Sequence, residues 1–223
     1  MTYGFLALAF LLAILDWVAV AGKWKNIEFF AKPAVMLALI AFLITKVGAQ
    51  GHLIWFLFGL LFSMFGDIFL MLPKERFIPG LVSFLLTHIA YLIGFTTSIP
   101  EINLAGIILF LIIFITAYQI FTRIAAGLDS SQNGELKIPV LLYTIVISLM
   151  LLSALLTLLR PEWRFLTAMS ASLGALLFFL SDTFLAWNKF VHPIQHGNLI
   201  VIISYHIGQI LIVLGAAYHF GTI

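Results

Sequence analysis

Long apolar stretches alternate with short polar ones along the whole chain. A membrane-spanning helix needs about 20 apolar residues, within a range of about 17–25. Eight segments fit or approach this length: residues 4–20, 33–47, 53–72, 78–97, 103–122, 138–159, 165–187 and 198–218. Segments with strictly alternating apolar and polar residues, which are typical of membrane β-barrels, are absent. The pattern therefore predicts an all-α fold, a polytopic transmembrane bundle of eight helices.

The ends of these segments refine the prediction. The second segment is short, so Lys32 and Lys46 at its two ends are expected to reach the membrane surface through their long side chains. The first segment lacks a basic start and contains Asp16, so we interpret it as a span and not as a signal peptide. The longest connection, about residues 123–137, is too short for a soluble domain. We therefore expect a single membrane domain, 1–223, whose helices carry the function.

Composition agrees with a membrane protein. Of the 223 residues, 63% are hydrophobic and only 9% are charged, whereas soluble domains carry about 25% charged residues. The chain has no cysteine, which excludes disulfides and thiol catalysis. The net charge of +2 indicates no nucleic-acid surface. We expect no cofactor and no metal.

Positive charges are distributed unevenly over the connections. The first, third, fifth and seventh connections hold eight of the 11 Lys and Arg residues: Lys23, Lys25, Lys32, Lys74, Arg76, Arg123, Lys137 and Lys189. The other three are Lys46, Arg160 and Arg164. The positive-inside rule then places the odd-numbered connections in the cytoplasm and both termini outside.

Two aspartates lie inside apolar segments, near the odd-numbered connections. Asp67 lies six residues before Pro73, and Asp182 lies seven before Lys189. At about 1.5 Å per residue, several other polar side chains fall in the same half of the bilayer: His88, Tyr91, Tyr143, Tyr205 and His206. A single tyrosine or serine at such a depth is often interhelical glue. A charge at the bilayer centre costs about 2.5–3.5 kcal/mol, so we interpret the two aspartates as functional.

The two aspartates belong to an apparent internal repeat. The shared features are a D-x-F-L core (66–71 and 181–186), a lysine seven residues after the aspartate (Lys74 and Lys189), and a polar pair in the next helix (His88 with Tyr91, His206 with Gln209). Equivalent features lie four helices apart and run in the same direction. The pattern predicts two parallel four-helix repeats, 1–100 and 103–223. Asp67 and Asp182 would then face each other across a central cavity.

Two facing carboxylates in a poorly hydrated cavity can form an acid–base pair. They repel each other, so one keeps its proton while the other is ionised. One then donates a proton, and the other activates water or stabilises a cation. A serine nucleophile is not indicated, because the chain has no G-x-S-x-G motif and Ser181 faces another side of its helix.

The chain resembles the YhhN-like lysoplasmalogenases, which are multi-pass membrane hydrolases. The elements that carry the resemblance are AKP (31–33), FGDIFLML (65–72), FIPGLVSFLLTHIAY (77–91), Tyr143, GALLFFLSDTFLAWNKF (174–190) and SYHIGQ (204–209). The resemblance implies an eight-helix fold. It also implies cleavage of the vinyl ether bond of lysoplasmalogens, which yields a fatty aldehyde and a glycerophospho-ethanolamine or -choline. A bacterial inner membrane is the expected location, with the site in the cytoplasmic half.

The candidate residues suit this chemistry. A vinyl ether is hydrolysed by protonation of carbon, which gives an oxocarbenium ion that water captures. Either Asp67 or Asp182 is expected to be the acid, and the other to stabilise the cation. The residues expected to orient water and the glycerol hydroxyl are His88, Tyr91, Tyr143, Tyr205, His206 and Gln209. Lys32, Asn188 and Lys189 lie at the depth of a lipid phosphate, to which lysine offers a point charge.

Three other functions fit parts of the pattern. A proton-coupled transporter of a small amphiphile would also use a repeat and intramembrane acids. A metal hydrolase would need Asp67, Asp182, His88 and His206 as ligands, although no H-E-x-x-H motif is present. A structural or lipid-sensing bundle leaves the repeated acids without a role. The expected partners are a lysophospholipid substrate and membrane lipids, with no nucleic acid, and the oligomeric state stays open.

Overall fold

The computed structural model describes residues 2–72, 76–97 and 103–221, and it confirms the predicted all-α fold. Eight helices in the described residues are long and apolar enough to cross a membrane. They are α1 (Thr2–Gly22), α2 (Lys25–Lys46), α3 (Leu53–Met71), α4 (Phe77–Phe95), α5 (Leu104–Ser130), α6 (Lys137–Leu156), α7 (Phe165–Phe190) and α8 (Gly197–Phe220). Short 3₁₀ helices, Gly134–Leu136 and Thr157–Leu159, precede and follow α6.

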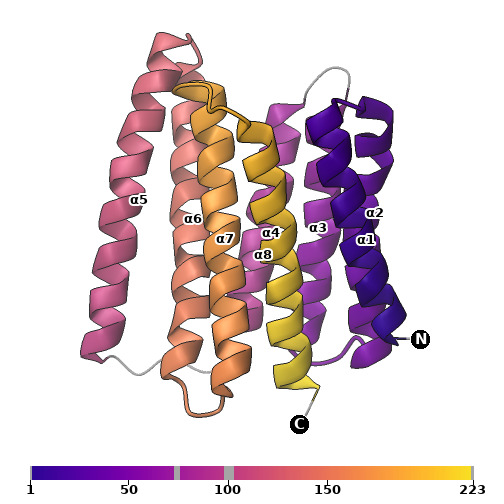
Figure 1. Ribbon diagram of the computed structural model, residues 1–223. Coiled ribbons are helices and arrows are strands. Elements are labelled where there is room, and N and C mark those ends of the chain that lie inside the picture. The colour runs from indigo at the N-terminus through magenta and orange to yellow at the C-terminus, as the bar shows by residue number, and fades with distance from the viewer. Residues whose placement is uncertain (1, 73–75, 98–102, 222–223) are drawn as a thin grey trace.

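The helices cross the bundle in alternating directions, so all odd-numbered connections lie at one end and both termini at the other (Figure 1). We call the first end the odd end. The pairs α1–α2, α3–α4 and α7–α8 pack most extensively. The contacts α4–α6 and α2–α8 join the first four helices to the last four. α5 lies at the edge of the bundle and is the least buried of the described helices (Figure 1).

Helix α2 begins at Lys25, eight residues before the predicted start of this span at residue 33. Pro33 lies inside the helix and not at its beginning. Proline lacks the backbone N–H that would bond to the carbonyl of Phe29, but the remaining turns continue past it. Lys32 is therefore two turns inside the helix, and the prediction that it marks the end of the span is wrong.

Helix α5 continues to Ser130, beyond the predicted end at residue 122. Arg123 interrupts the apolar run, but Ile124 and Leu128 recur at helical spacing and are buried against α6 and Phe190 of α7. The connection predicted at residues 123–137 is therefore mostly helical. This extra length of α5 covers the side of the bundle where Asp182 lies.

Small residues bring α7 and α8 into close contact. A Cβ atom on Gly174 would lie 2.7 Å from the carbonyl oxygen of Gly208, and one on Gly208 would lie 2.9 Å from that of Gly174. No side chain fits between these backbones, as is common where membrane helices pack tightly. The contact fixes α7, which carries Asp182, against α8, which carries Tyr205 and His206.

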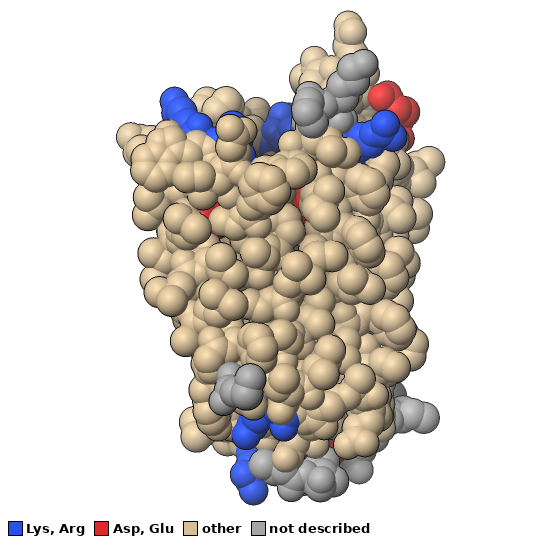
Figure 2. Space-filling model, turned by 90° about the vertical axis from the view of Figure 1, so that its right-hand side faces the viewer, with Lys and Arg blue, Asp and Glu red and all other residues tan. Residues whose placement is uncertain are grey.

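The surface is divided as expected for a protein within a bilayer. On the face shown in Figure 2, charged side chains gather at the two ends, and the broad band between them is almost entirely uncharged. Many large apolar residues of the helices are exposed, among them Leu11, Leu37, Ile112 and Leu173. In water such a surface would be costly, so it indicates contact with lipid.

Candidate active site

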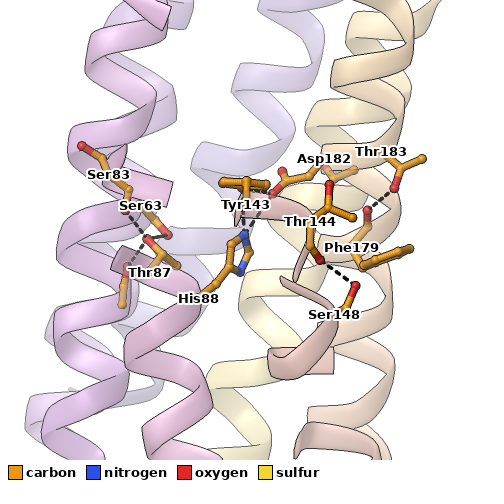
Figure 3. A network of polar contacts seen from close by, with 12 residues as sticks. Ser63, Ser83, Thr87, His88, Tyr143, Thr144, Ser148, Phe179, Asp182 and Thr183 are labelled. Carbon is orange, nitrogen blue, oxygen red and sulfur yellow. Dashed lines mark hydrogen bonds and ion pairs between the residues drawn. The ribbon is translucent and has the colours of Figure 1, made fainter. Parts of the chain in front are cut away.

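Asp182 of α7 is held by side chains from two other helices (Figure 3). The Nε2 atom of His88 on α4 lies 3.0 Å from Oδ2 of Asp182 and 2.8 Å from the hydroxyl of Tyr143 on α6. The Tyr143 hydroxyl donates to the same Oδ2 atom. No described group donates to Oδ1. We call these three residues the Asp182 centre. One of its carboxylate oxygens is therefore left for a bound molecule.

Asp67 of α3 has a different set of partners, and both of its oxygens are engaged. The Tyr205 hydroxyl on α8 donates to Oδ2 at 2.8 Å. The Lys32 ammonium on α2 lies 3.3 Å from Oδ1. Only 1% of the Asp67 side chain and 15% of that of Lys32 are exposed, so this is an ion pair largely removed from water. We call these three residues the Asp67 centre.

The two centres follow the same plan in the predicted repeats. Each aspartate lies on the third helix of its half. Asp67 is bound by α2 of its own half and by α8, the fourth helix of the other half. Asp182 is bound by α6 and α4, which are the corresponding helices. This exchange is what a pseudo-twofold axis would produce, although the repeat itself stays a prediction.

Aromatic rings lie between the two centres. Phe178 packs against His88 with ring centroids 4.6 Å apart, and against Tyr205 with centroids 5.3 Å apart. Phe84 contacts both Phe178 and Tyr205. No hydrogen bond joins the two carboxylates among the described residues. They act on each other through space, in a core that screens charge poorly.

An apolar groove reaches the Asp182 centre from the side of the bundle. Its enclosed part is small, about 70 Å³, and it lies between α4, α5, α6 and α7. Asp182, Tyr143, Thr144 and Thr183 are the polar residues of its wall. The remaining lining is aliphatic or aromatic, including Ile120, Ile147 and Phe179. The groove is suited to a hydrocarbon chain that brings a reactive bond to Asp182.

A larger polar cavity, of about 500 Å³, opens at the odd end, and we call it the vestibule. Its charged and amide residues are Lys25, Glu28, Lys32, Asn188, Lys189 and Asn198. Leu70, Phe77 and Leu185 line both the vestibule and the groove, so the two cavities are neighbours that share these side chains as a wall. A polar chamber beside an apolar groove matches the two parts of an amphiphile with one chain.

Lys189 and Asn188 lie where the sequence predicts a phosphate site. The Lys189 ammonium sits over the ring of Phe77, 5.2 Å from its centroid, which places the charge beside the wall that the two cavities share. Asn188 donates to Asn198 at 3.2 Å and accepts from the backbone N–H of Ile194 at 2.8 Å. It therefore also stabilises the turn between α7 and α8. Lys74, the repeat equivalent of Lys189, lies outside the described residues.

Tyr91 and Gln209 line neither cavity and belong to a closed polar network. The Tyr91 hydroxyl donates to Gln209 at 2.6 Å, and Gln209 donates to the Ser63 hydroxyl at 2.7 Å. Ser63 in turn contacts Thr87 at 3.1 Å. All four side chains are buried and connect α3, α4 and α8. Their predicted role in substrate binding stays a prediction, but this geometry favours interhelical support.

His206 is fully buried beside the Asp67 centre. Its Nδ1 atom accepts a hydrogen bond from the indole of Trp17 at 3.2 Å, whereas Nε2 has no hydrogen-bond partner. Asp16 of α1 is also buried, with neither oxygen hydrogen-bonded, and it interacts electrostatically with Lys32. His206 therefore joins α1 to α8 and does not reach the groove.

Sequence reasoning missed Glu28 and Trp17. Glu28 fell in a predicted connection because the span was taken to begin after Pro33. A helix beginning at Lys25 would have placed Lys25, Glu28 and Lys32 on one face. For Trp17 no pattern signals the bond to His206, because the pairing depends on how α1 docks on α8. Among the described residues, no three His, Asp or Glu side chains gather closely enough to hold a metal ion.

Comparison with known proteins identifies the family. Residues 27–216 match the YhhN family, and this range includes all the residues of both centres and of the groove. This chain belongs to the YhhN family. In this YhhN member, the residues of both centres thus lie within the part of the chain that defines the family.

Several curated relatives are identical to this YhhN member at about a third of the aligned positions. Lysoplasmalogenase TMEM86B of Homo sapiens is 32% identical over 161 residues, or 71% of this chain and 61% of the human protein. Lysoplasmalogenase TMEM86B of Mus musculus is 31% identical over 214 residues, or 94% of this chain and 83% of the mouse protein. Lysoplasmalogenase TMEM86A of Bos taurus is 31% identical over 161 residues, with 63% of the bovine protein covered. The chain thus spans less than two thirds of some relatives. No solved structure matches it significantly.

Proposed function

We propose that this protein is a membrane-embedded hydrolase that cleaves the vinyl ether bond of lysoplasmalogens. The products are a fatty aldehyde and a glycerophospho-ethanolamine or -choline. Membership of the YhhN family and relatives named lysoplasmalogenase support the substrate class. The structural observation that carries the proposal is the position of Asp182, in the wall of an apolar groove that lies next to a polar vestibule.

In this proposal, each part of the substrate has a place in one of the two cavities. The hydrocarbon chain lies in the groove among Ile120, Ile147 and Phe179. The phosphate lies in the vestibule near Lys189 and Lys32. The glycerol passes between Leu70, Phe77 and Leu185, the wall that the cavities share. The vinyl ether then lies beside the Asp182 centre.

Asp182 is the proton donor in this mechanism. A proton on Oδ1, the oxygen to which no described group donates, passes to the vinyl carbon that does not bear oxygen. The cation that forms is shared between the other vinyl carbon and the ether oxygen. Tyr143 and His88 hold Oδ2 and so keep the carboxyl group aimed into the groove.

Asp67 has a supporting electrostatic role. The Lys32 ammonium and the Tyr205 hydroxyl contact its two oxygens and favour its ionised form. Its negative charge lies near the Asp182 centre, in a core where charges are poorly screened, and it favours the oxocarbenium ion. It lines neither cavity, so it acts at a distance and not as a nucleophile.

Water completes the reaction. The carboxylate left on Asp182 takes a proton from a water molecule as that water adds to the cationic carbon, which regenerates the acid. The hemiacetal then breaks its bond to the glycerol oxygen, which takes the hydroxyl proton. One water is consumed, and one aldehyde and one alcohol are released. His88, bound to both Asp182 and Tyr143, can carry protons within the centre.

We further propose that the odd end faces the cytoplasm of a bacterial inner membrane. Eight of the 11 basic residues belong to the odd-numbered connections predicted from the sequence, which supports that orientation. The vestibule would then receive lysolipids from the cytoplasmic leaflet.

A lipid panel tests the proposed function. Purified protein in nanodiscs is incubated with alkenyl, alkyl and acyl lysophospholipids that share one head group, and aldehyde is measured by mass spectrometry. We expect aldehyde from the alkenyl lipid alone, because only this lipid forms an oxocarbenium ion when its carbon is protonated. Release of fatty acid from the acyl lipid, without aldehyde from the alkenyl lipid, would contradict the proposal.

A further inference from the structure

One carboxylate of the vestibule has no part in the chemistry described above. Glu28 lies on α2, one turn before Lys32, and lines the vestibule. We propose that Glu28 binds the primary ammonium of an ethanolamine head group and thereby sets the head-group preference of the enzyme. This assignment rests on the proposed function, because it concerns the same substrate.

Charge complementarity in the vestibule supports this role. Among the described residues that line it, Lys25, Lys32 and Lys189 are cations and Glu28 is the single carboxylate. A phosphoethanolamine head carries an anion and a cation on either side of a two-carbon bridge. Side chains four residues apart on a helix have Cβ atoms about 5–6 Å apart. Lys32 and Glu28 therefore present opposite charges at a spacing of the same order as that bridge.

The protein partner of Glu28 is far more exposed than the partners of the two aspartates. Asp67 is committed to Lys32 and Tyr205, and Asp182 to His88 and Tyr143. Glu28 pairs with Lys25 at 2.9 Å, but 77% of the Lys25 side chain is exposed. Exposed ion pairs of this kind contribute little to stability. A ligand ammonium can therefore replace Lys25 at the carboxylate at small cost.

The Glu28 side chain is itself well shielded, with only 14% of its surface exposed. An ammonium bound there is partly removed from water, which strengthens its attraction to the carboxylate. A primary ammonium can also donate hydrogen bonds to the carboxylate oxygens, as lysine does. The quaternary ammonium of choline has no N–H and can use only its charge. The vestibule therefore favours ethanolamine over choline.

Binding of non-cleavable lipids tests the role of Glu28 separately from hydrolysis. Alkyl ether lysolipids with ethanolamine, choline or bare phosphate heads are competed against a fluorescent lysolipid on protein in nanodiscs. For Glu28→Gln we expect Kd to rise about tenfold for ethanolamine and about threefold for choline, because a charge-assisted hydrogen bond is lost only in the first case. Binding of the bare phosphate should stay unchanged or become tighter.

Glu135→Gln provides the matched control, because it makes the same charge change at the odd end but outside both cavities. It should leave all three Kd values unchanged. Equal losses for all three lipids in Glu28→Gln would indicate a structural role and overturn the assignment, as would no change at all. The alkenyl forms of the same lipids are assayed in parallel. If wild-type protein cleaves none of them, the proposed function fails, while the Kd series still decides the role of Glu28.

Discussion

The Asp67 and Asp182 centres have the same architecture but different chemistry. Each holds an aspartate between the second helix of one half and the fourth helix of the other. The partners of Asp67 include a lysine, whereas those of Asp182 are a tyrosine and a histidine. Asp67 is buried with both oxygens engaged, whereas Asp182 has one oxygen open toward the groove. In the proposed mechanism, similar arrangements of helices thus provide one fixed charge and one reactive acid.

Loss of the acid should have the largest effect and separates the two centres. Asp182→Asn removes the proton donor, so we expect aldehyde release to fall by about 10³-fold or more, near the upper contribution of general acid catalysis. Asp67→Asn should cost less, about 10²-fold, because its charge acts at a distance. The measurement is aldehyde release per mole of monodisperse protein. Asp129→Asn, an exposed carboxylate on α5, is the control. An active Asp182→Asn variant would reverse the assignment of the acid.

Removing the lysine should reveal that the Asp67 centre depends on charge balance. Lys32→Met leaves Asp67 buried without its cation, at a cost of about 3 kcal/mol. We expect a clear fall in the melting temperature of the protein in detergent. The double variant with Asp67→Asn should recover most of this loss, since the unpaired charge is gone. An unchanged melting temperature in Lys32→Met would contradict a stabilising ion pair between Lys32 and Asp67.

The two tyrosines allow a finer comparison. Tyr143→Phe removes one of the two groups that hold the reactive carboxyl, so we expect kcat to fall about tenfold to a hundredfold, with little change in KM. Tyr205→Phe removes a donor from the fixed charge and should lower kcat only a few-fold. Both variants keep the ring and its packing. If Tyr205→Phe has the greater effect on kcat, Asp67 and not Asp182 is closer to the reacting bond.

The smallest effect is expected in the buried network that contains Tyr91 and Gln209. Tyr91→Phe removes one buried hydrogen bond to Gln209, so stability should fall by about 1 kcal/mol. KM and kcat should stay near their wild-type values, because neither residue lines a cavity. A large rise in KM would instead support the predicted role of Tyr91 in substrate binding.

Much of the fold, and the position of Asp67 and Asp182 inside the bundle, could be predicted from the sequence. The apolar runs gave the eight spans, and the high cost of an intramembrane carboxylate singled out Asp67 and Asp182. The partners of these residues were harder to predict. Depth in the membrane places His88 and Gln209 at similar levels, but only the rotation of each helix decides that His88 faces Asp182 and Gln209 faces Ser63.

The two boundary errors share a physical cause. Pro33 and Arg123 both resemble helix ends in a sequence, yet each lies inside a helix. In α2 a single missing backbone hydrogen bond did not outweigh the turns on either side. In α5 burial of Ile124 and Leu128 continued the helix past a charged residue. The first error concealed Glu28, since it assigned the first two turns of α2 to a connection.

The peripheral position of α5 has a consequence for how the reaction ends. This helix forms one wall of the groove, and most of its residues are not buried against other helices. A long-chain aldehyde formed beside Asp182 would therefore need to pass only α5 to move laterally into the hydrocarbon interior of the bilayer. In the proposed reaction, the water-soluble alcohol would leave through the vestibule, which Lys25, Lys32 and Lys189 line. Separating the two products between the membrane interior and the aqueous phase would oppose their recombination.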